Sequence, residues 1–177
     1  YDVYLPNHPG KSELQIISPV QLTLSQKEGE LAEDPFSTDP RLHLGFNAFS
    51  GSGDVTAEVV YVNYGTREDF IKLVEMGVPL KGKVAIARYG GNFRGYKAKF
   101  AEQQGMVGLV VYTDPKDSGF TRGDVYPKGP FYNETTIQRG SMLTLDFTGD
   151  PLTPNRPALP LDGPVKIKRD DPATVDF

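Results

Sequence analysis

The amino-acid sequence predicts a single α/β domain, and two observations carry this prediction. The chain has 177 residues, of which 38% are hydrophobic and 24% are charged, an ordinary composition for one globular unit with a buried core. A β-prone run, a short helical run and a second β-prone run follow one another between residues 83 and 115. A crossover of this length usually returns a parallel strand, which is typical of α/β folds.

The first 54 residues predict strands followed by a long surface segment. The β-prone runs SELQIISP and VQLTLS predict a hairpin or paired edge strands. Residues 26–54 are acidic at first and Gly/Ser-rich later, which predicts a surface excursion whose carboxylates are solvated. We therefore expect residues 1–54 to form the N-terminal strands and long loop of the domain.

From residue 55 the sequence predicts a strand and a capped helix. TAEVVYVNY is β-prone, and the hydroxyl of Thr66 can accept a backbone N–H at the start of the helix that follows. Asp69 would lie near the positive end of this helix, and Gly77 suits the position just after its last turn. Its buried face is expected to carry three apolar residues: Phe70, Leu73 and Val74.

A second unit of strand, helix and strand follows. KVAIAR predicts a buried strand, YKAKFAEQQ predicts a short helix ended by Gly105, and GLVVYTDP predicts another strand. The Gly-, Pro- and Tyr-rich stretch from Pro115 to Gln138 is too long for a plain connector, so we expect a docking surface or a binding loop there. SMLTLDFTGDPLTP and PVKIK are the last strand candidates.

The loop before the second helix, RYGGNFRGYK, resembles part of a phosphate-binding loop. Gly90 and Gly95 have the spacing of such a loop, but Tyr96 and Lys97 stand where it needs Lys and Ser/Thr. A helix N-terminus and Arg94 remain, and the planar guanidinium of Arg94 can bind a carboxylate through two bonds. The alternative is that Arg94 pairs with an acid of the chain itself. The other basic residues here are expected to be solvated: Arg88, Lys97 and Lys99.

Composition and residue types exclude several classes of function. A net charge of −4 and an isoelectric point near 5.2 lack the basic excess that nucleic-acid binding requires. No apolar run of about 18 residues occurs, so we expect no membrane contact by this chain. There is no cysteine, and His8 and His43 lie in loop-like sequence without a second ligand nearby, so no cofactor is expected in this chain. FSGSG lacks the nucleophile elbow of a serine hydrolase.

Six motifs occur in order along the chain: VYVNYGTREDFIKL (60–73), GKVAIARYGGNFRGYKAK (82–99), GLVVYTDPKD (108–117), YPKGP (126–130), QRGS (138–141) and GDPLTP (149–154). Together they resemble the protease-associated (PA, apical) domain of the M28B zinc peptidases, the family of glutamate carboxypeptidase II and the transferrin receptor. On this resemblance we place the core of the domain at residues 55–158 and a truncated C-terminal tail at residues 159–177.

The resemblance implies a swivelling β/β/α fold, a mixed open β-barrel or sandwich flanked by short helices. Such a domain covers the active-site funnel of a separate peptidase domain with two zinc ions. It therefore implies that this chain gates and recognises substrate and is not an enzyme on its own. The implied parent is a secreted M28-type zinc carboxypeptidase that is extracellular, periplasmic or a membrane-anchored ectodomain and that can form a homodimer.

The resemblance also implies roles for four residues. The arginine of the family's FRG motif binds the α-carboxylate of the substrate's C-terminal residue, and it falls on Arg94. A second polar contact is an asparagine in the family and Ser141 here, a shorter donor that does not imply strict preference for glutamate. The family's structural calcium takes backbone oxygens that fall on Thr153 and Arg156, while its carboxylate ligands come from the peptidase domain.

Two other functions remain open on the sequence. One is a free-standing PA module that binds a peptide or protein partner, as sorting receptors with such domains do. The other is a relative that kept the fold for dimerisation and receptor work and lost the chemistry. Arg94 is retained in this chain, which favours substrate binding over the receptor-only function.

Overall fold

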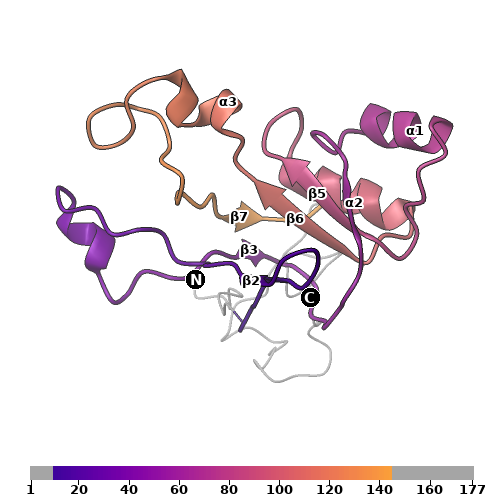
Figure 1. Cartoon of the computed structure of the whole chain (residues 1–177), viewed down its shortest axis with the longest axis horizontal. Coiled ribbons are helices and arrows are strands. Elements are labelled where there is room, and N and C mark those ends of the chain that lie inside the picture. Colours follow the sequence, from indigo (N-terminus) through magenta and orange to yellow (C-terminus); the bar gives the residue numbers. More distant parts are fainter. Residues whose placement is uncertain (1–9, 145–177) are drawn as a thin grey trace, which may run out of the picture.

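The computed structural model describes residues 10–144 and has the predicted mixed α/β class, with small sheets and short helices (Figure 1). Within these residues the strands form no closed barrel. The candidate strand PVKIK and the tail lie outside the described residues. The elements in chain order are β1 (Gln15–Ile16), β2 (Leu22–Thr23), the 3-10 helix η1 (Pro35–Thr38), β3 (Asn47–Ala48), β4 (Val59–Tyr61), α1 (Arg67–Glu75), β5 (Val84–Arg88), α2 (Arg94–Gln103), β6 (Gly108–Tyr112), α3 (Pro115–Ser118), η2 (Phe120–Arg122) and β7 (Gly140–Ser141).

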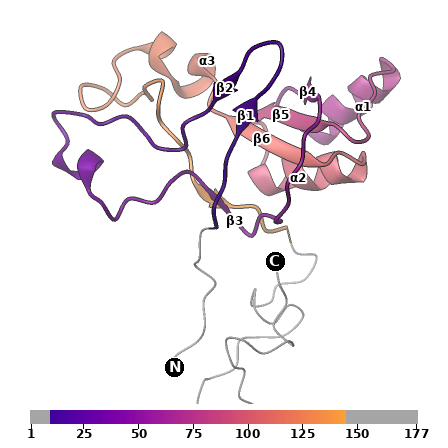
Figure 2. The ribbon, with the colours of Figure 1, turned by 60° about the horizontal axis from the view of Figure 1, so that its bottom comes forward.

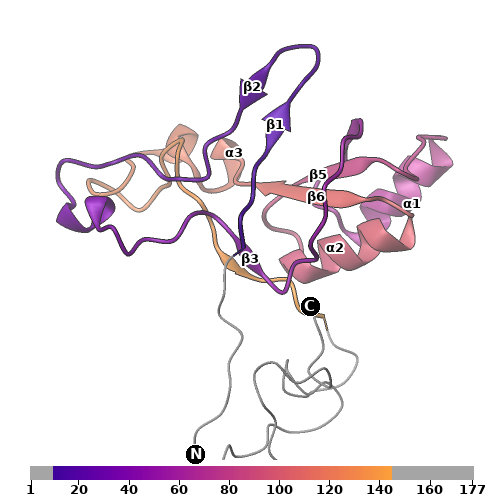
Figure 3. The ribbon, with the colours of Figure 1, turned by 90° about the horizontal axis from the view of Figure 1, so that it is seen from below.

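The central sheet has the order β4-β5-β6, and both of its strand pairs are parallel. The parallel return predicted for the second strand–helix–strand unit is therefore confirmed. Along β5, Ala85 and Ala87 are fully buried and face α1 and α2, which lie on one face of the sheet (Figure 3). Their small side chains leave room for the larger members of the core: Val62, Phe70, Leu80 and Met106.

The predicted cap of α1 is present in full. The backbone N–H of Asp69 donates to Thr66 Oγ1 at 3.2 Å, and the Asp69 carboxylate accepts the backbone N–H of Thr66 at 3.0 Å. The same carboxylate accepts from the side-chain amide of Asn63 at 2.8 Å. Gly77 follows the helix with a φ of 71°, as expected of the residue that ends it.

The predicted buried face of α1 is correct at two of its three positions. Phe70 is 2% exposed and Leu73 packs against the core, but Val74 is 54% exposed. The prediction for Val74 is wrong because the core contacts only the stripe of α1 that carries Phe70 and Leu73.

The predicted hairpin is present as the antiparallel pair β1 and β2, in which Gln15 faces Thr23. It projects away from the central sheet, on the side opposite to α1 and α2 (Figures 2 and 3). Its apolar side chains are exposed, with Ile17 and Val20 each at 59%. A two-stranded hairpin has no core of its own, so these side chains have no partner within the hairpin.

The segment expected to be a plain surface excursion, residues 26–54, instead contributes a strand. Asn47 and Ala48 of β3 pair in parallel with Gly140 and Ser141 of β7, from the far end of the described chain. Two-residue strands give no periodic signal, so the hydrophobic pattern could not indicate this pairing.

The carboxylates of this segment are also not all solvated, contrary to the prediction. Glu28 accepts the backbone N–H of Ile137 at 2.9 Å and pairs with Arg139 at 3.0 Å. Arg139 in turn donates to the carbonyl of His43 at 2.7 Å. These bonds fix the acidic segment to the chain that leads into β7.

Asp69→Asn is expected to lower the free energy of unfolding at neutral pH by about 1 to 2 kcal/mol, because the carboxylate is the charged acceptor of the α1 cap. Burial raises the pKa of Asp69, but the hydrogen bonds from Asn63 and Thr66 outweigh it and hold the pKa below its ordinary 3.8. The stabilisation is therefore complete above the ordinary pKa and is lost as the pH falls through the lower folded value.

Urea unfolding of wild type and variant at pH 7 and near pH 3 measures this difference. Glu68→Gln is the matched control, since Glu68 lies in the same helical turn but is exposed. A difference between wild type and Asp69→Asn that is the same at both pH values would contradict the role of the charge.

Candidate functional site

The start of α2 lies directly against β7, and the absence of side chains on both sides makes this possible. A Cβ atom built on Gly140 would lie 1.7 Å from Nη2 and 2.1 Å from Cζ of Arg94. A Cβ on Gly95 would lie 2.5 Å from the carbonyl oxygen of Met142. The guanidinium of Arg94 therefore lies on the bare backbone of Gly140, and any larger residue there would displace it.

We call the contact between the Arg94 guanidinium and the backbone of Gly140 the seat of Arg94. Two buried polar atoms of the residues that form or adjoin this contact have no hydrogen-bond partner. Among the described residues, only Arg94 Nε and Asn47 Oδ1 are buried side-chain polar atoms left unbonded. Asn47 is the residue that pairs with Gly140 across β3 and β7. No carboxylate in residues 10–144 pairs with Arg94, so the alternative of a local acid partner finds no support there. A buried donor without an acceptor is costly, and a ligand oxygen would satisfy it.

Of the other predicted site residues, Ser141 lies in β7 beside the seat of Arg94. Its Oγ accepts the backbone N–H of Leu143 at 3.0 Å, which leaves its own hydroxyl hydrogen free to donate. In the described part of the chain no hydrogen bond joins Ser141 to Arg94. Thr153 and Arg156, the expected calcium ligands, lie outside the described residues.

Lys97, expected to be solvated, is fully buried. Its ammonium group donates to the carbonyl of Tyr64, to the carbonyl of Gly90 at 2.6 Å and to Asn92 Oδ1 at 2.8 Å. Burial lowers the pKa of Lys97 to about 8, and the charge of Asp69 opposes this shift, so the group is charged at neutral pH. The expectation failed because one acceptor, on Tyr64, lies 33 residues away, and no local pattern shows that the loop before α2 folds back over the ammonium group.

Arg88 was likewise expected to be a solvated charge, and the structure pairs it with two acids. Its Nη2 lies 2.8 Å from Asp117 Oδ2 and its Nε lies 3.3 Å from Asp114 Oδ2. Its guanidinium also lies over the ring of Tyr64, 4.5 Å from the centroid. These contacts fasten α3 to the carboxyl end of β5.

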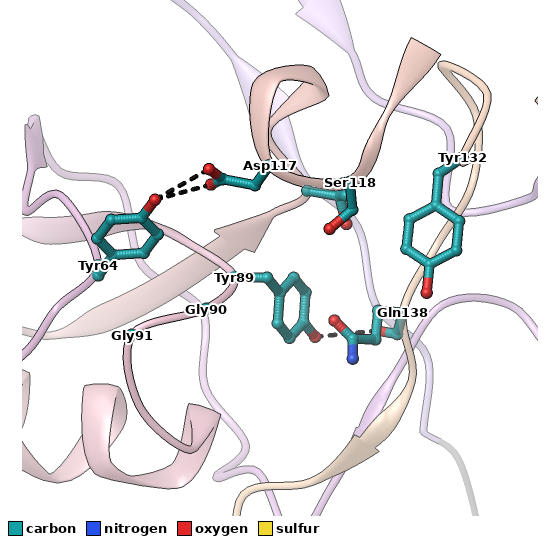
Figure 4. Close-up of a pocket in the computed structure, with 9 residues that line it drawn as sticks. Tyr64, Tyr89, Gly90, Gly91, Asp117, Ser118, Tyr132 and Gln138 are labelled. Atoms are coloured by element: carbon teal, nitrogen blue, oxygen red, sulfur yellow. Dashed lines mark hydrogen bonds between the residues drawn. The ribbon is translucent and has the colours of Figure 1, made fainter. Parts of the chain in front are cut away.

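A hollow of about 410 Å³ opens at the carboxyl ends of the parallel strands (Figure 4). In α/β sheets this edge is where ligands usually bind. The Tyr64 hydroxyl donates to both oxygens of Asp117, and the Tyr89 hydroxyl donates to the carbonyl of Gln138 at 3.0 Å. The hollow is lined by Tyr64, Tyr89, Gly90, Gly91, Thr113, Asp117, Ser118, Tyr132 and Gln138. The Gly- and Tyr-rich stretch thus supplies part of its wall.

Tyr89 connects this hollow to the seat of Arg94. Burial raises the pKa of Tyr89, while the charge of Arg94 and a hydrogen bond with Asn47 lower it. Tyr89 therefore lines the hollow and also interacts with Arg94 and Asn47, the two residues that carry unbonded buried atoms. Sequence reasoning missed Asn47, because an asparagine in a Gly/Ser-rich stretch reads as an ordinary turn residue.

Metal ligands do not gather in the part of the chain that the structure describes. No group of three His, Asp or Glu side chains there could hold an ion. Of the two histidines, His43 lies against Phe46 in a ring contact and His8 is outside the described residues. Among residues 10–144 there is also no helix of the length and apolarity needed to cross a membrane.

Known proteins are similar to this chain over most of its length. A probable glutamate carboxypeptidase of Arthroderma benhamiae is 46% identical over 160 residues, which cover 86% of this chain and 22% of that protein. The glutamate carboxypeptidase 2 homolog of Caenorhabditis elegans is 42% identical over 114 residues, 63% of this chain and 14% of that protein. Aminopeptidase NAALADL1 of Rattus norvegicus is 38% identical over 128 residues, 70% of this chain and 17% of that protein.

The chain thus spans about a fifth or less of the length of these relatives. The family described as the PA domain matches residues 55–144, just over half of the chain. This match includes β4 to β7, the strands and helices that carry Arg94, Lys97 and the hollow. The chain therefore belongs to the PA domain family, as the ordered motifs of its sequence predicted.

Proposed function

We propose that this chain is the substrate-gating, substrate-recognising apical domain of a secreted M28-type zinc carboxypeptidase and is not catalytic on its own. In this proposal Arg94 binds the α-carboxylate of the C-terminal residue of a peptide substrate. The observation that carries it is the buried and unbonded Nε of Arg94, which lies on Gly140 without an acidic partner in the described chain. The names of the relatives, two of them glutamate carboxypeptidases, support it.

The geometry of the seat suits a carboxylate. A guanidinium presents parallel N–H donors that match the two oxygens of a carboxylate, and such charge-assisted pairs are the strong ones. Arg94 is also the first residue of α2, whose N-cap Phe93 makes no side-chain hydrogen bond, so the partial positive charge of the helix start adds to it. Ser141 supplies the second polar contact in this proposal, through its free hydroxyl hydrogen.

The main partner in this proposal is the peptidase domain of the same polypeptide. The exposed apolar side chains of the β1–β2 hairpin support it, as do Val59 and Tyr61, which are 59% and 49% exposed on the sheet face away from α1 and α2. A swivelling domain that covers an active-site funnel would bury surfaces of this kind. The parent can also form a homodimer.

The metals of the proposed parent lie mainly outside this chain. The described residues offer no fitting ligand group, so we place both zinc ions in the peptidase domain. A calcium ion would take the backbone carbonyls of Thr153 and Arg156, with its carboxylate ligands from the same peptidase domain.

We propose an extracellular, periplasmic or membrane-anchored location for the parent. The sequon Asn133-Glu134-Thr135 supports export, since its acceptor Asn133 is only partly buried and the two residues after it are exposed. Asn133 Oδ1 accepts from the backbone N–H and the hydroxyl of Thr135, each at 2.9 Å, so the three residues form a compact surface turn.

The alternative function is a free-standing PA module that binds a peptide or protein partner. The hollow of Figure 4 favours it, because tyrosine walls with several hydrogen-bonding groups suit a peptide without any peptidase domain. The two functions differ in the sequence beyond this chain. A carboxypeptidase parent would carry zinc-ligand histidine and acidic motifs there.

The isolated chain is expected to hydrolyse no N-acyl dipeptide, with or without added zinc, because the described residues provide no zinc ligands and no base beside a bound water. The measurement is release of the C-terminal amino acid by purified chain. Zinc-dependent turnover by this chain alone would contradict its assignment as a non-catalytic domain.

In the full-length parent, Arg94→Ala is expected to lower kcat/KM for free-acid substrates roughly ten- to a hundredfold, mainly through KM, because a charge-assisted pair contributes about 1.5 to 3 kcal/mol. Substrates with an amidated C-terminus should hardly change. Arg94→Lys should restore only part of the loss, since a point charge lacks the planar fork.

The measured quantity is the ratio of kcat/KM for free-acid and amidated substrates. Arg67→Ala is the matched control, because Arg67 opens α1 as Arg94 opens α2 but is exposed. If the ratio is the same in wild type and Arg94→Ala, Arg94 does not bind the carboxylate.

Gly140→Ala is expected to reduce the same ratio by about the same factor as Arg94→Ala. The new methyl group would occupy the position of the Arg94 guanidinium, which is the movable end of a long side chain, so the fold should survive while Arg94 is displaced. The double variant should lose no more than Arg94→Ala alone. Gly51→Ala, whose Cβ would meet nothing within 4 Å, is the control. A normal ratio in Gly140→Ala would show that Arg94 acts from another position.

A further inference from the structure

The buried ammonium group of Lys97 has an acceptor for each of its three hydrogens. The acceptors are the carbonyl of Tyr64, the carbonyl of Gly90 and the side-chain oxygen of Asn92. A lysine ammonium has three donors and no acceptor, so this arrangement satisfies it completely. No ligand is needed to complete the site, and the contact is internal to the protein.

The three acceptors come from two separate chain segments. Tyr64 lies in the turn after β4, whereas Gly90 and Asn92 lie in the loop between β5 and α2, which we call the glycine loop (residues 89–93). Asn92 also donates from its side-chain amide to the carbonyl of Gly65 at 3.2 Å. The stem of Lys97 packs on the same turn, since a Cβ on Gly65 would lie 3.2 Å from Cβ of Lys97. Lys97 therefore joins the glycine loop to the turn after β4.

The glycine loop ends where Arg94 begins. Arg94 follows Asn92 by two residues and precedes Lys97 by about one helical turn. Lys97 is therefore in the first turns of α2, the helix that follows the glycine loop, and its side chain reaches back to that loop. Gly90 and Tyr64, whose carbonyls accept from Lys97, also line the hollow at the sheet edge.

We propose that Lys97 is a positioning residue, whose ammonium group fixes the glycine loop to the turn after β4 and thereby sets where Arg94 lies on Gly140. The part of this proposal that concerns substrate rests on the proposed function of Arg94. The part that concerns the loop does not. Lys97 itself touches no substrate, because it is fully buried.

Lys97→Met keeps the length and apolar stem of the side chain and removes its charge and donors. We expect amide hydrogen exchange to become about tenfold faster or more at Gly65 and Arg88, whose N–H groups bond to Val62 and Asn63 in the fixed turn. Gly82, bonded to Gly105 at the opposite end of the sheet, should change about twofold or less. Lys72→Met, the same change at an exposed site on α1, is the control. Equal acceleration at all three amides would overturn the proposal, since the effect would then be global.

Two variants of Asn92 keep the test decisive if Lys97→Met does not fold. Asn92→Ala removes one acceptor of Lys97 and the bond to Gly65, and should accelerate exchange at Gly65 and Arg88 in the same local pattern. Asn92→Asp keeps an oxygen for the ammonium group and should accelerate it less. Exchange that is unchanged in Asn92→Ala, or equal in both variants, would overturn the role of the Lys97 contact.

The kinetic arm uses the full-length parent and the ratio of kcat/KM for free-acid and amidated substrates. Lys97→Met, or Asn92→Ala in its place, should reduce this ratio about three- to tenfold through KM for the free acid, with kcat/KM for the amide nearly unchanged. If Arg94→Ala reduces the ratio and neither of these variants does, the positioning role is wrong while the proposed function stands. If Arg94→Ala has no effect, the proposed function is wrong, and the exchange pattern alone decides whether Lys97 fixes the loop.

Discussion

The close approach of α2 to β7 is the constraint on which the candidate site depends. Arg94 lies on the bare backbone of Gly140, and Gly95 lies against the carbonyl of Met142. Neither position can accept a larger residue without a shift, because even one methyl group would overlap atoms of the facing segment. The two chain segments are therefore in close contact, and the guanidinium fills the space that a side chain of residue 140 would otherwise occupy.

Three cations at or beside the glycine loop are stabilised in three different ways. Arg88 pairs with two aspartates, and Lys97 is surrounded by three oxygens of the protein. Arg94 has neither kind of partner within residues 10–144, although its Nε is buried. Within the described residues, the cation that fastens α3 (Arg88) and the cation that holds the glycine loop (Lys97) are thus satisfied, and Nε of Arg94 has unused hydrogen-bonding capacity. This division separates two residues that support the fold from the one for which we propose a ligand.

Local signals made the central part of the fold predictable from sequence. The cap at Thr66 and the apolar runs of β5 and β6 act over a few residues, and each was predicted correctly. The burial of Lys97 could not be predicted, because its acceptor on Tyr64 lies 33 residues away. The pairing of β3 with β7 is hidden for the same reason, and with it the position of Asn47. Arg94 was singled out from its place at a helix start, and the motif then gave it a role, but neither indicated that it lies on the backbone of Gly140.

The link between Glu28 and Arg139 joins residues 111 positions apart. The central sheet, by contrast, is built from one continuous stretch, residues 59–112. Contacts between distant residues cost more loop entropy, so folding should begin in that stretch and close the seat of Arg94 late. During synthesis, a nascent chain that has not yet emerged as far as Gly140 has all the residues of the parallel sheet but lacks the backbone on which Arg94 lies. The order of folding therefore makes the contact between Arg94 and Gly140 one of the last that the domain forms.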